Sequence, residues 1–316
     1  MSVLHRARVR LVASCAAVLA VVGVGALTLA PSAGAVKVGS TYLALGDSLA
    51  YGYHQAKFEE ELASGHVEPE SFNDGYVNDF DQLVKVFNPN VKLINDGCPG
   101  EGTETMIHGS VFPGQACGGE DAAPFPYVFL HHPYSTKTQL EDALKILHEN
   151  PNVSPITLDI GANDLLHFIA AHCGFPAASN CTEAQYAAEF AHIAGNVAFI
   201  LGQLRAAAPH AQIVLVGLYN PFPDFPSEGG DKLTAGLNQA LETVASGVTG
   251  TSFANPEPLF NPSIVLGTPE STDLPVICTL TAMCPEGKFS PAGDIHPTKL
   301  GYQVMAGIVS FEFLTH

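Results

Sequence analysis

Short apolar runs alternate along this chain with stretches in which apolar residues recur every three or four positions. The runs predict buried strands, and the spaced pattern predicts helices with one apolar face. Strands are expected at 41–46, 91–95, 155–160, 211–217 and 251–254. Helices are expected at 77–87, 136–147, 165–171, 182–204, 233–244 and 300–311. This alternation indicates βαβ units and a parallel sheet, with the ligand site at the carboxyl ends of its strands.

Helix ends and faces follow from the same pattern. Thr136 with Gln139 fits a capping box, and Thr182 is expected to begin the longest helix. The last helix is expected to turn one apolar face to the core, formed by Leu300, Val304, Ile308 and Phe311.

Three long stretches show no apolar period and are rich in polar residues, Gly or Pro. They predict an exposed loop at 54–74, a disulfide-tied loop at 101–134 and a Pro-rich connection at 255–296. We see no internal repeat and no second composition regime, so one domain is expected.

The first 35 residues differ from the rest. Arg6, Arg8 and Arg10 precede an apolar run at 11–30 and small residues at 31–35, which is typical of a secretory signal peptide cut after Ala35. An uncleaved membrane anchor is the alternative, because the run approaches bilayer-spanning length. Its glycines and its cleavage site favour removal. The mature protein is therefore expected to be a secreted, extracellular single domain, 36–316, with no stable membrane anchor.

Composition and net charge limit the classes of binding partner that are expected. With 47% hydrophobic residues, the 316-residue chain has ample material for a packed core. The net charge of −18 repels nucleic acid and anionic membranes, so we expect neither as a partner. A monomer is expected.

Six of the seven cysteines follow residue 35, and an even count in a secreted chain favours disulfides. Fifteen pairings are formally possible. Their clustering favours three short loops, joining Cys98 to Cys117, Cys173 to Cys181 and Cys278 to Cys284. A zinc site is the competing interpretation, but no CxxC pair supports it. No metal or cofactor is expected.

Four chemically interesting residues lie in predicted loops: Ser48, Gly97, Asn163 and His296. The first three directly follow the first three strands, so they are expected to meet at one sheet edge. Each has an ordinary explanation when taken alone, because turns use glycine and serine and helix caps use asparagine. Only their conjunction predicts a site.

Four motifs carry that conjunction: Gly46-Asp47-Ser48-Leu49, Asn95-Asp96-Gly97, Gly161-Ala162-Asn163-Asp164 and Asp294-Ile295-His296-Pro297. In order and spacing they resemble the SGNH (GDSL) hydrolase superfamily over essentially the whole mature chain, and most of all secreted actinobacterial esterases and lipases with three disulfides. The resemblance implies an α/β fold, a flavodoxin-like three-layer α/β/α sandwich with a central, mostly parallel five-stranded sheet. It also implies ester hydrolysis through an acyl-enzyme.

The chemistry assigns roles to these residues. A serine hydroxyl is a weak nucleophile, so Ser48 needs His296 as its general base. The tetrahedral intermediate needs oxyanion donors, for which the backbone N–H groups of Ser48 and Gly97 and the side-chain amide of Asn163 are the candidates. Asp47 and Asp164 are expected to bond nearby backbone, and His131 and His132 to form a solvated loop pair.

The acid of the expected triad departs from the family pattern. The family usually carries it three residues before the histidine, where this chain has Gly293, and the nearest carboxylate is Asp294, two residues before. Either Asp294 reaches His296 Nδ1 in a rearranged loop, or a main-chain carbonyl orients the ring. Our hypothesis is that Asp294 contributes.

The leading interpretation is thus a metal-independent serine esterase or lipase acting on a small-molecule or lipid ester. A carbohydrate acetyl esterase or deacetylase using the same site is one alternative, although the absence of tryptophan weakens sugar stacking. A non-catalytic extracellular binding module on the same scaffold is another. The joint presence of Ser48, Asn163 and His296 argues against the second alternative.

Overall fold

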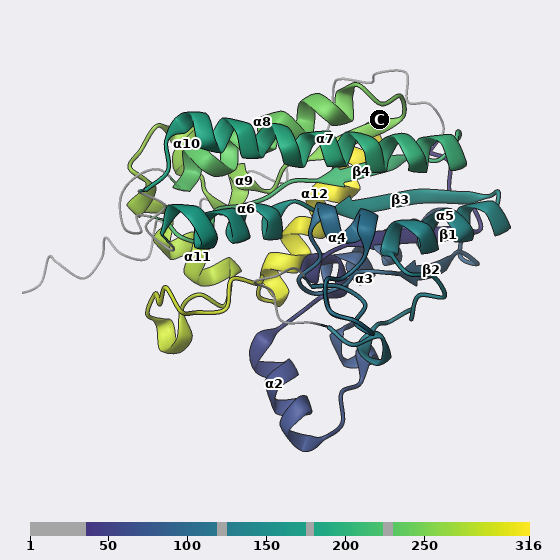
Figure 1. Ribbon diagram of the computed structural model, residues 1–316, viewed down its shortest axis with the longest axis horizontal. Helices are drawn as coiled ribbons and strands as arrows, with labels where there is room; N and C mark the ends of the chain where they lie inside the picture. The colour runs from purple at the N-terminus through teal and green to yellow at the C-terminus, as the bar shows by residue number, and fades with distance from the viewer. Residues whose placement is uncertain (1–35, 119–124, 175–179, 224–229) are drawn as a thin grey trace, which may run out of the picture. The chain divides into compact units, whose positions relative to one another are not determined.

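Five parallel strands form one sheet at the centre of the fold (Figure 1). They are β1 (Thr41–Gly46), β2 (Lys92–Asn95), β3 (Val153–Asp159), β4 (Ile213–Val216) and β5 (Thr251–Ala254). Their order, β2-β1-β3-β4-β5, is the flavodoxin-like one, in which the chain changes direction across the sheet between β1 and β3. The five predicted strands and the parallel sheet are confirmed.

The computed structural model describes residues 36–118, 125–174, 180–223 and 230–316, which belong to the unit Ala35–His316. The expected signal peptide, 1–35, lies outside the described residues. None of the helices in the described part of the chain combines the length and the apolar character needed to span a bilayer.

Helices cover both faces of the sheet, because side chains alternate between the faces along each strand. Leu43 and Leu45 of β1 pack toward α5 (Gln139–Glu149), α7 (Glu183–Ala207) and α8 (Gly230–Ser246). Tyr42 and Ala44 pack on the opposite side, toward α3 (Tyr76–Phe87) and α12 (Lys299–Thr315). The predicted three-layer α/β/α sandwich is therefore confirmed (Figure 1).

The prediction that residues 54–74 form a loop is wrong. These residues contain α2 (Gln55–Ser64) and the 3₁₀ turn η1 (Pro69–Phe72). No residue of α2 is buried, so its sequence has no apolar stripe to reveal it. Good helix formers build it instead, and Gly65, with φ +76°, ends it.

The other two expected loops also contain short helices. The first holds α4 (Thr103–His108) and η2 (Tyr127–Phe129). The second holds α9 (Glu257–Phe260), α10 (Ser263–Leu266), η4 (Glu270–Asp273), α11 (Leu274–Leu280) and η5 (Pro285–Gly287). Elements of three to seven residues are too short to display a helical repeat. The remaining short elements follow strands directly: α1 (Ser48–Tyr51), and α6 (Ala162–Phe168) with the π-turn η3 (Ile169–Cys173).

Two predicted helix details need correction, whereas the N-cap of α7 at Thr182 is confirmed. The N-cap of α5 is Thr138, which accepts the Glu141 N–H, because Gln139 turns inward and is fully buried. Thr136 is therefore not part of a capping box.

The core-facing side of α12 is also not the predicted one. Val304 and Ile308 are partly buried against the core, as expected, but Leu300 and Phe311 are 49% and 62% exposed, and the buried face is centred on Tyr302, Met305, Val309 and Phe313. Gly301 is the physical reason: a Cβ there would lie 2.0 Å from the Leu280 carbonyl oxygen. This close approach to α11 fixes the rotation of α12.

All three expected disulfides are present, joining Cys98 to Cys117, Cys173 to Cys181 and Cys278 to Cys284, with Cα–Cα separations of 6.2, 4.8 and 5.0 Å. Short loops of this kind each contribute on the order of 2–4 kcal/mol to stability. The first disulfide ties the turn after β2 to residues 110–118, beside the site described next.

Candidate active site

Ser48 lies at the start of α1, directly beyond the end of β1. Asp47 caps this helix by accepting the Leu49 N–H at 2.9 Å. Gly46 adopts φ +138°, and a Cβ there would lie 2.2 Å from the Asp159 carbonyl oxygen. Asp159 Oδ1 accepts the N–H groups of Asp47 and Ala50 at 3.0 and 3.2 Å. The Ser48 turn, residues 46–51, is thus fixed from β1 and β3 together.

His296 lies against Ser48 although 248 residues separate them. Its Nε2 is 2.8 Å from Ser48 Oγ, and its Nδ1 is 2.5 Å from Asp294 Oδ1. The same Asp294 oxygen accepts the backbone N–H of His296 at 3.1 Å. The carboxylate therefore folds back over its own loop, as aspartates do in Asx turns, and reaches the ring from two residues away. The structure thus places a carboxylate at Nδ1.

Helix α2 holds the other oxygen of Asp294. The N–H of Gln55, the first residue of α2, donates to Asp294 Oδ2 at 2.9 Å. Burial by itself would raise the pKa of Asp294, but the hydrogen bonds and charge of His296 and the Gln55 N–H outweigh it, so the net pKa lies below its ordinary value. Asp294 is therefore ionised at neutral pH, and it accepts the Nδ1 proton of His296.

Three tyrosines support the His296 loop, residues 293–298. The Tyr53 ring packs edge-on against the His296 ring at 4.8 Å between centroids. Tyr302 donates to the Tyr53 carbonyl oxygen at 2.9 Å, and Tyr219 to the Ile295 carbonyl oxygen at 2.6 Å. Sequence reasoning missed these residues and Gln55. The only available signal was that Tyr53 and Gln55 follow Ser48 closely in the chain.

Asn163 lies in the first turn of α6, just after β3. Its Nδ2 donates to the Glu101 carbonyl oxygen at 2.9 Å and, less closely, to Asp47 Oδ2 at 3.3 Å. The side-chain amide therefore lies beside the Ser48 turn. Asp164 accepts from the Thr103 N–H at 3.0 Å and so bonds backbone, as expected.

Gly97 lies in the turn after β2 and packs directly on α1. A Cβ there would lie 2.6 Å from the Tyr51 nitrogen, which explains the glycine without any catalytic role. Its N–H donates to Asn95 Oδ1 at 2.9 Å, and Asn95 Nδ2 donates to the Ala50 carbonyl oxygen at 2.8 Å. The Gly97 N–H is thus engaged with its own turn.

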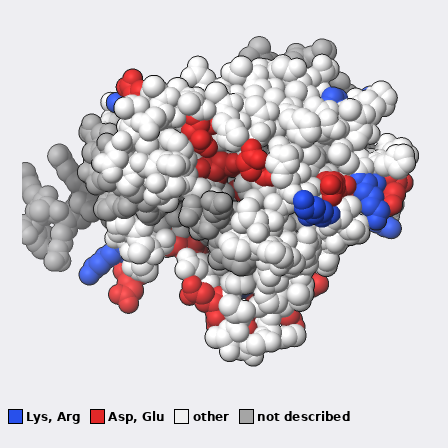
Figure 2. Space-filling view, viewed as in Figure 1, with Lys and Arg blue, Asp and Glu red and all other residues white. Residues whose placement is uncertain are grey.

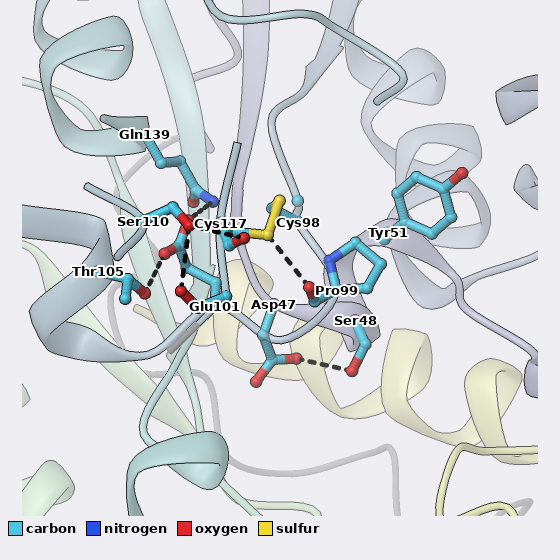
Figure 3. The surroundings of a disulfide bond; sticks show 12 residues. Asp47, Ser48, Tyr51, Cys98, Pro99, Glu101, Thr105, Ser110, Cys117 and Gln139 are labelled. Carbon is cyan, nitrogen blue, oxygen red and sulfur yellow. Dashed lines mark hydrogen bonds between the residues drawn. A yellow bond between two sulfur atoms is a disulfide. The ribbon is translucent and has the colours of Figure 1, made fainter. Parts of the chain in front are cut away.

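Several buried acids lie beside the Ser48 turn. Figure 3 shows two of them, Asp47 and Glu101, close to the Cys98–Cys117 disulfide. Burial raises the pKa of Asp47, and burial together with the Asp47 charge raises the pKa of Asp159 well above its ordinary value. Burial also raises the pKa of Glu101 to about 8. Glu101 accepts from Thr105 Oγ1 and, at 3.2 Å, from Gln139 Nε2.

Gln139 connects these acids to β1, since its amide accepts from the Gly46 N–H at 2.7 Å and donates to the Gly46 carbonyl oxygen at 2.9 Å. The end of β1 is therefore held by paired hydrogen bonds from α5.

The two adjacent histidines, expected to be solvated, are instead partly buried and hydrogen-bonded. His131 Nε2 is 2.9 Å from the Tyr51 carbonyl oxygen, and its ring packs on Tyr51. His132 Nδ1 is 2.7 Å from Asp96 Oδ1. The pair is placed here because residues 125–134 fold back over α1, beside the segment that the Cys98–Cys117 disulfide anchors.

The described surface agrees with the negative net charge. Acidic side chains gather near the middle of the face shown, whereas lysine and arginine side chains are few and scattered (Figure 2).

The solved structures similar to this chain include lipases and esterases. A lipase from a goat rumen metagenome, Lip_vut3, has a TM-score of 0.52 at 18% identity, covering 87% of this chain and 98% of its own. Phospholipase A1 from Streptomyces albidoflavus NA297 has a TM-score of 0.50 at 18% identity, covering 87% and 100%. A variant of Axe2, an acetyl-xylooligosaccharide esterase from Geobacillus stearothermophilus, has a TM-score of 0.50 at 12% identity, covering 88% and 95%. At these identities the likeness shows the shared fold.

No curated protein matches this chain significantly by sequence. A family match does exist, and it covers residues 44–304, from within β1 into α12. This range contains Ser48, Asn163, Asp294 and His296. Since the match spans most of the sequence, the chain belongs to the GDSL-like lipase/acylhydrolase family.

Proposed function

We propose that this acyl hydrolase is a secreted serine esterase or lipase that cleaves carboxylic esters through an acyl-enzyme on Ser48. The observation that carries the proposal is the continuous hydrogen-bonded series from Ser48 Oγ to His296 Nε2 and from His296 Nδ1 to Asp294. A nucleophile, a base within reach of its proton and an acid that orients the base are the parts that acyl transfer requires.

Each proton has a defined route. His296 Nε2 takes the Ser48 proton as Oγ bonds to the ester carbon, and it returns that proton to the leaving alcohol when the C–O bond breaks. Water then attacks the acyl-enzyme and loses a proton to the same Nε2, which passes that proton to Ser48 Oγ as the acyl–Oγ bond breaks and the acid is released. Asp294 stays ionised and accepts a hydrogen bond from the Nδ1 proton of His296 throughout. Its charge offsets the positive charge that develops on the ring.

The oxyanion donors come from two sides of the Ser48 turn. The Ser48 N–H at the start of α1 and Asn163 Nδ2 are the first candidates. The amide contact of Asn163 to Asp47 is long, at 3.3 Å, so a substrate oxyanion is expected to replace it. The predicted donor Gly97 would first have to release Asn95 Oδ1.

Gly100 is an additional candidate donor in the same turn. Its φ is +85°, and its N–H donates to no protein group among the described residues. It directly precedes Glu101, whose carbonyl oxygen binds Asn163 Nδ2. The Gly100 peptide and the Asn163 amide therefore lie next to each other.

Aromatic packing beside His296 favours esters of longer acyl chains over acetyl esters. Tyr53 packs against Phe58, at 5.3 Å between ring centroids, as well as against His296. Phe58 and Phe129 are partly exposed and continue this apolar surface along α2 and η2. An acyl chain leaving the ester carbon would find apolar contact there.

Secretion is part of the proposal. The three disulfides support an oxidising compartment, and the sequence of residues 1–35 supports export. Sequencing the N-terminus of the protein recovered from culture medium should give Val36 as the first residue. A first residue within 1–35 would contradict the predicted cut.

Active-site labelling tests the nucleophile. A fluorophosphonate probe should label the wild-type protein and fail to label Ser48→Ala, with the two variants equally folded by circular dichroism. Labelling that persists in Ser48→Ala would reject Ser48. No labelling and no hydrolysis across a broad ester panel, in a folded wild-type protein, would favour the non-catalytic binding module.

A substrate panel separates the two enzymatic alternatives. We expect a higher kcat/KM for p-nitrophenyl palmitate than for p-nitrophenyl acetate, and little release of acetate from acetyl-xylan. The reverse order would assign the site to carbohydrate acetyl esters.

A further inference from the structure

Three side chains from separate segments lie close together at the turn that follows β2. They are Asp96 from that turn, His132 from the loop after η2, and Asp142 from α5. One ligand atom from each lies within 4.8 Å of the other two. His132 Nδ1 is 2.7 Å from Asp96 Oδ1 and 3.6 Å from Asp142 Oδ2. An imidazole nitrogen and two carboxylates therefore lie close enough together to share one small ligand.

Burial makes this cluster unlike a surface ion pair. Asp96 and Asp142 are 0% and 1% exposed, whereas the side chain of His132 is 40% exposed. Asp96 Oδ2 is buried and has no hydrogen-bond partner in the part of the chain that the structure describes. Buried carboxylate oxygens are nearly always satisfied, so this oxygen indicates a missing partner. Because it shares a carbon with Oδ1, it lies beside the cluster.

Surrounding contacts orient both acids. Asp142 Oδ1 accepts from the Ser135 N–H at 2.8 Å and from Ser135 Oγ at 2.9 Å, which leaves Oδ2 for the cluster. Tyr134 donates to the Asp96 carbonyl oxygen at 2.5 Å. Supporting hydrogen bonds of this kind fix ligand orientation at metal sites.

We propose that Asp96, His132 Nδ1 and Asp142 bind one divalent first-row transition cation, with zinc as the reference ion and water at the remaining positions. Mixed imidazole and carboxylate ligands suit zinc, whereas calcium takes six to eight oxygen ligands and magnesium keeps several waters. Binding at Nδ1 displaces the proton that lies between His132 Nδ1 and Asp96 Oδ1: a neutral imidazole moves it to Nε2, and an imidazolium releases one proton to solvent. The side chain of His132 is partly exposed, so an ion can reach the cluster from solvent on that side.

The plainer alternative is an imidazolium paired with two carboxylates. That pairing leaves Asp96 Oδ2 without a partner and keeps Asp142 Oδ2 at 3.6 Å, beyond hydrogen-bond distance. A cation between the three groups accounts for both features.

The cation would be structural. Asp96 begins the turn that continues through Cys98 to Glu101, and Glu101 orients Asn163. A metal bond from Asp96 to α5 therefore fixes this turn at its first residue, as the disulfide does two residues later. The proposal rests on the cluster alone and does not depend on Ser48 being the nucleophile.

Calorimetry on the purified chain, without a histidine tag and after EDTA treatment, tests the proposal. We expect one saturable zinc site, a higher unfolding midpoint with zinc, and no comparable response to calcium. His132→Ala should weaken zinc binding by about 100-fold or more, because even the loss of a supporting residue costs 10–100-fold.

His66→Ala is the matched control. His66 pairs with Glu68 at 2.8 Å, but this exposed pair contains a single carboxylate, so its loss should leave zinc affinity unchanged. Asp142→Asn, which keeps an acceptor for Ser135, is the second variant and should also weaken binding. The absence of saturable zinc binding, or an affinity unchanged in both His132→Ala and Asp142→Asn, would overturn the proposal.

Discussion

A 2.8 Å hydrogen bond joins the Ser48 turn to the His296 loop, but the pKa values of the acids in the two regions are shifted in opposite directions. Around Ser48, burial raises the pKa of Asp47, Asp159 and Glu101. At the His296 loop, Asp294 is also largely buried, yet its net pKa is lowered. The difference is the partner: Asp294 faces an imidazole and two backbone N–H groups, whereas hydroxyl, amide and neighbouring carboxyl groups surround Glu101.

The two regions also differ in what holds them. The Ser48 turn is fixed by the sheet, through Gly46 and Asp159, and by Gln139 at the start of α5. The His296 loop is fixed by side chains and backbone from distant segments, among them Tyr53 and Gln55. The Ser48 turn and the His296 ring are thus held in place by two different means.

The largest loss of activity is expected when the charge of Asp294 is removed. Asp294→Asn should lower kcat for an ester by on the order of 10⁴-fold, because the ring loses the negative charge that stabilises its imidazolium and an amide in that place permits the wrong tautomer. Asp74→Asn is the control, since Asp74 lies 3.4 Å from a different histidine, His54. A change in Asp294→Asn no larger than that of the control would show that Asp294 does not orient the base.

Removing an oxyanion donor tests the Ser48 side. Asn163→Ala should lower kcat by about 10²–10³-fold with a smaller change in KM, because the amide acts on charge that develops in the transition state. Asn196→Ala is the control, as Asn196 donates instead to Thr103 and Glu104. An effect on KM alone would assign Asn163 to substrate binding.

Changing the support of the His296 ring should have a smaller effect. Tyr53→Leu should reduce kcat by about two- to tenfold, the value of an aromatic contact of 0.5–1.5 kcal/mol. Tyr53→Phe keeps the ring and should retain wild-type kcat. Equal losses in both variants would assign the effect to the hydroxyl group instead of the ring contact.

The opposite pKa shifts predict opposite contributions to stability with pH. Glu101, raised from 4.5 to about 8, binds its proton more tightly in the folded state, so stability should fall as pH rises from about 5 to 8. Asp294, with a lowered pKa, stabilises the fold above its unfolded value and loses this contribution as pH falls below about 4.

Unfolding midpoints at pH 5 and 9 measure the Glu101 contribution. Glu101→Gln should reduce the loss of midpoint between these pH values by on the order of 5 °C, whereas the exposed Glu104→Gln should not change it. An identical pH dependence in wild type and Glu101→Gln would show that Glu101 does not bind the extra proton.

Much of the fold follows from local pattern. The strands ending before Ser48 and Asn163 are short, mainly apolar and buried along their whole length, and the disulfides join neighbours in the sequence. Helix α2 has no apolar stripe because none of its residues is fully buried, and α12 departs from the predicted face because Gly301 packs on the Leu280 carbonyl oxygen. Both errors concern contacts that no period within a segment encodes.

The sequence by itself determined the α/β/α class, the strand ends at which Ser48 and Asn163 lie, and the presence of a carboxylate close to His296. Only the tertiary structure decided that Asp294 reaches Nδ1, that Gly97 bonds its own turn, and that Asp96, His132 and Asp142 converge. The physical reason is that apolar periodicity is a local property of each segment. Orientation of polar groups depends on partners far along the chain, such as the Gln55 N–H that holds Asp294 from 239 residues away.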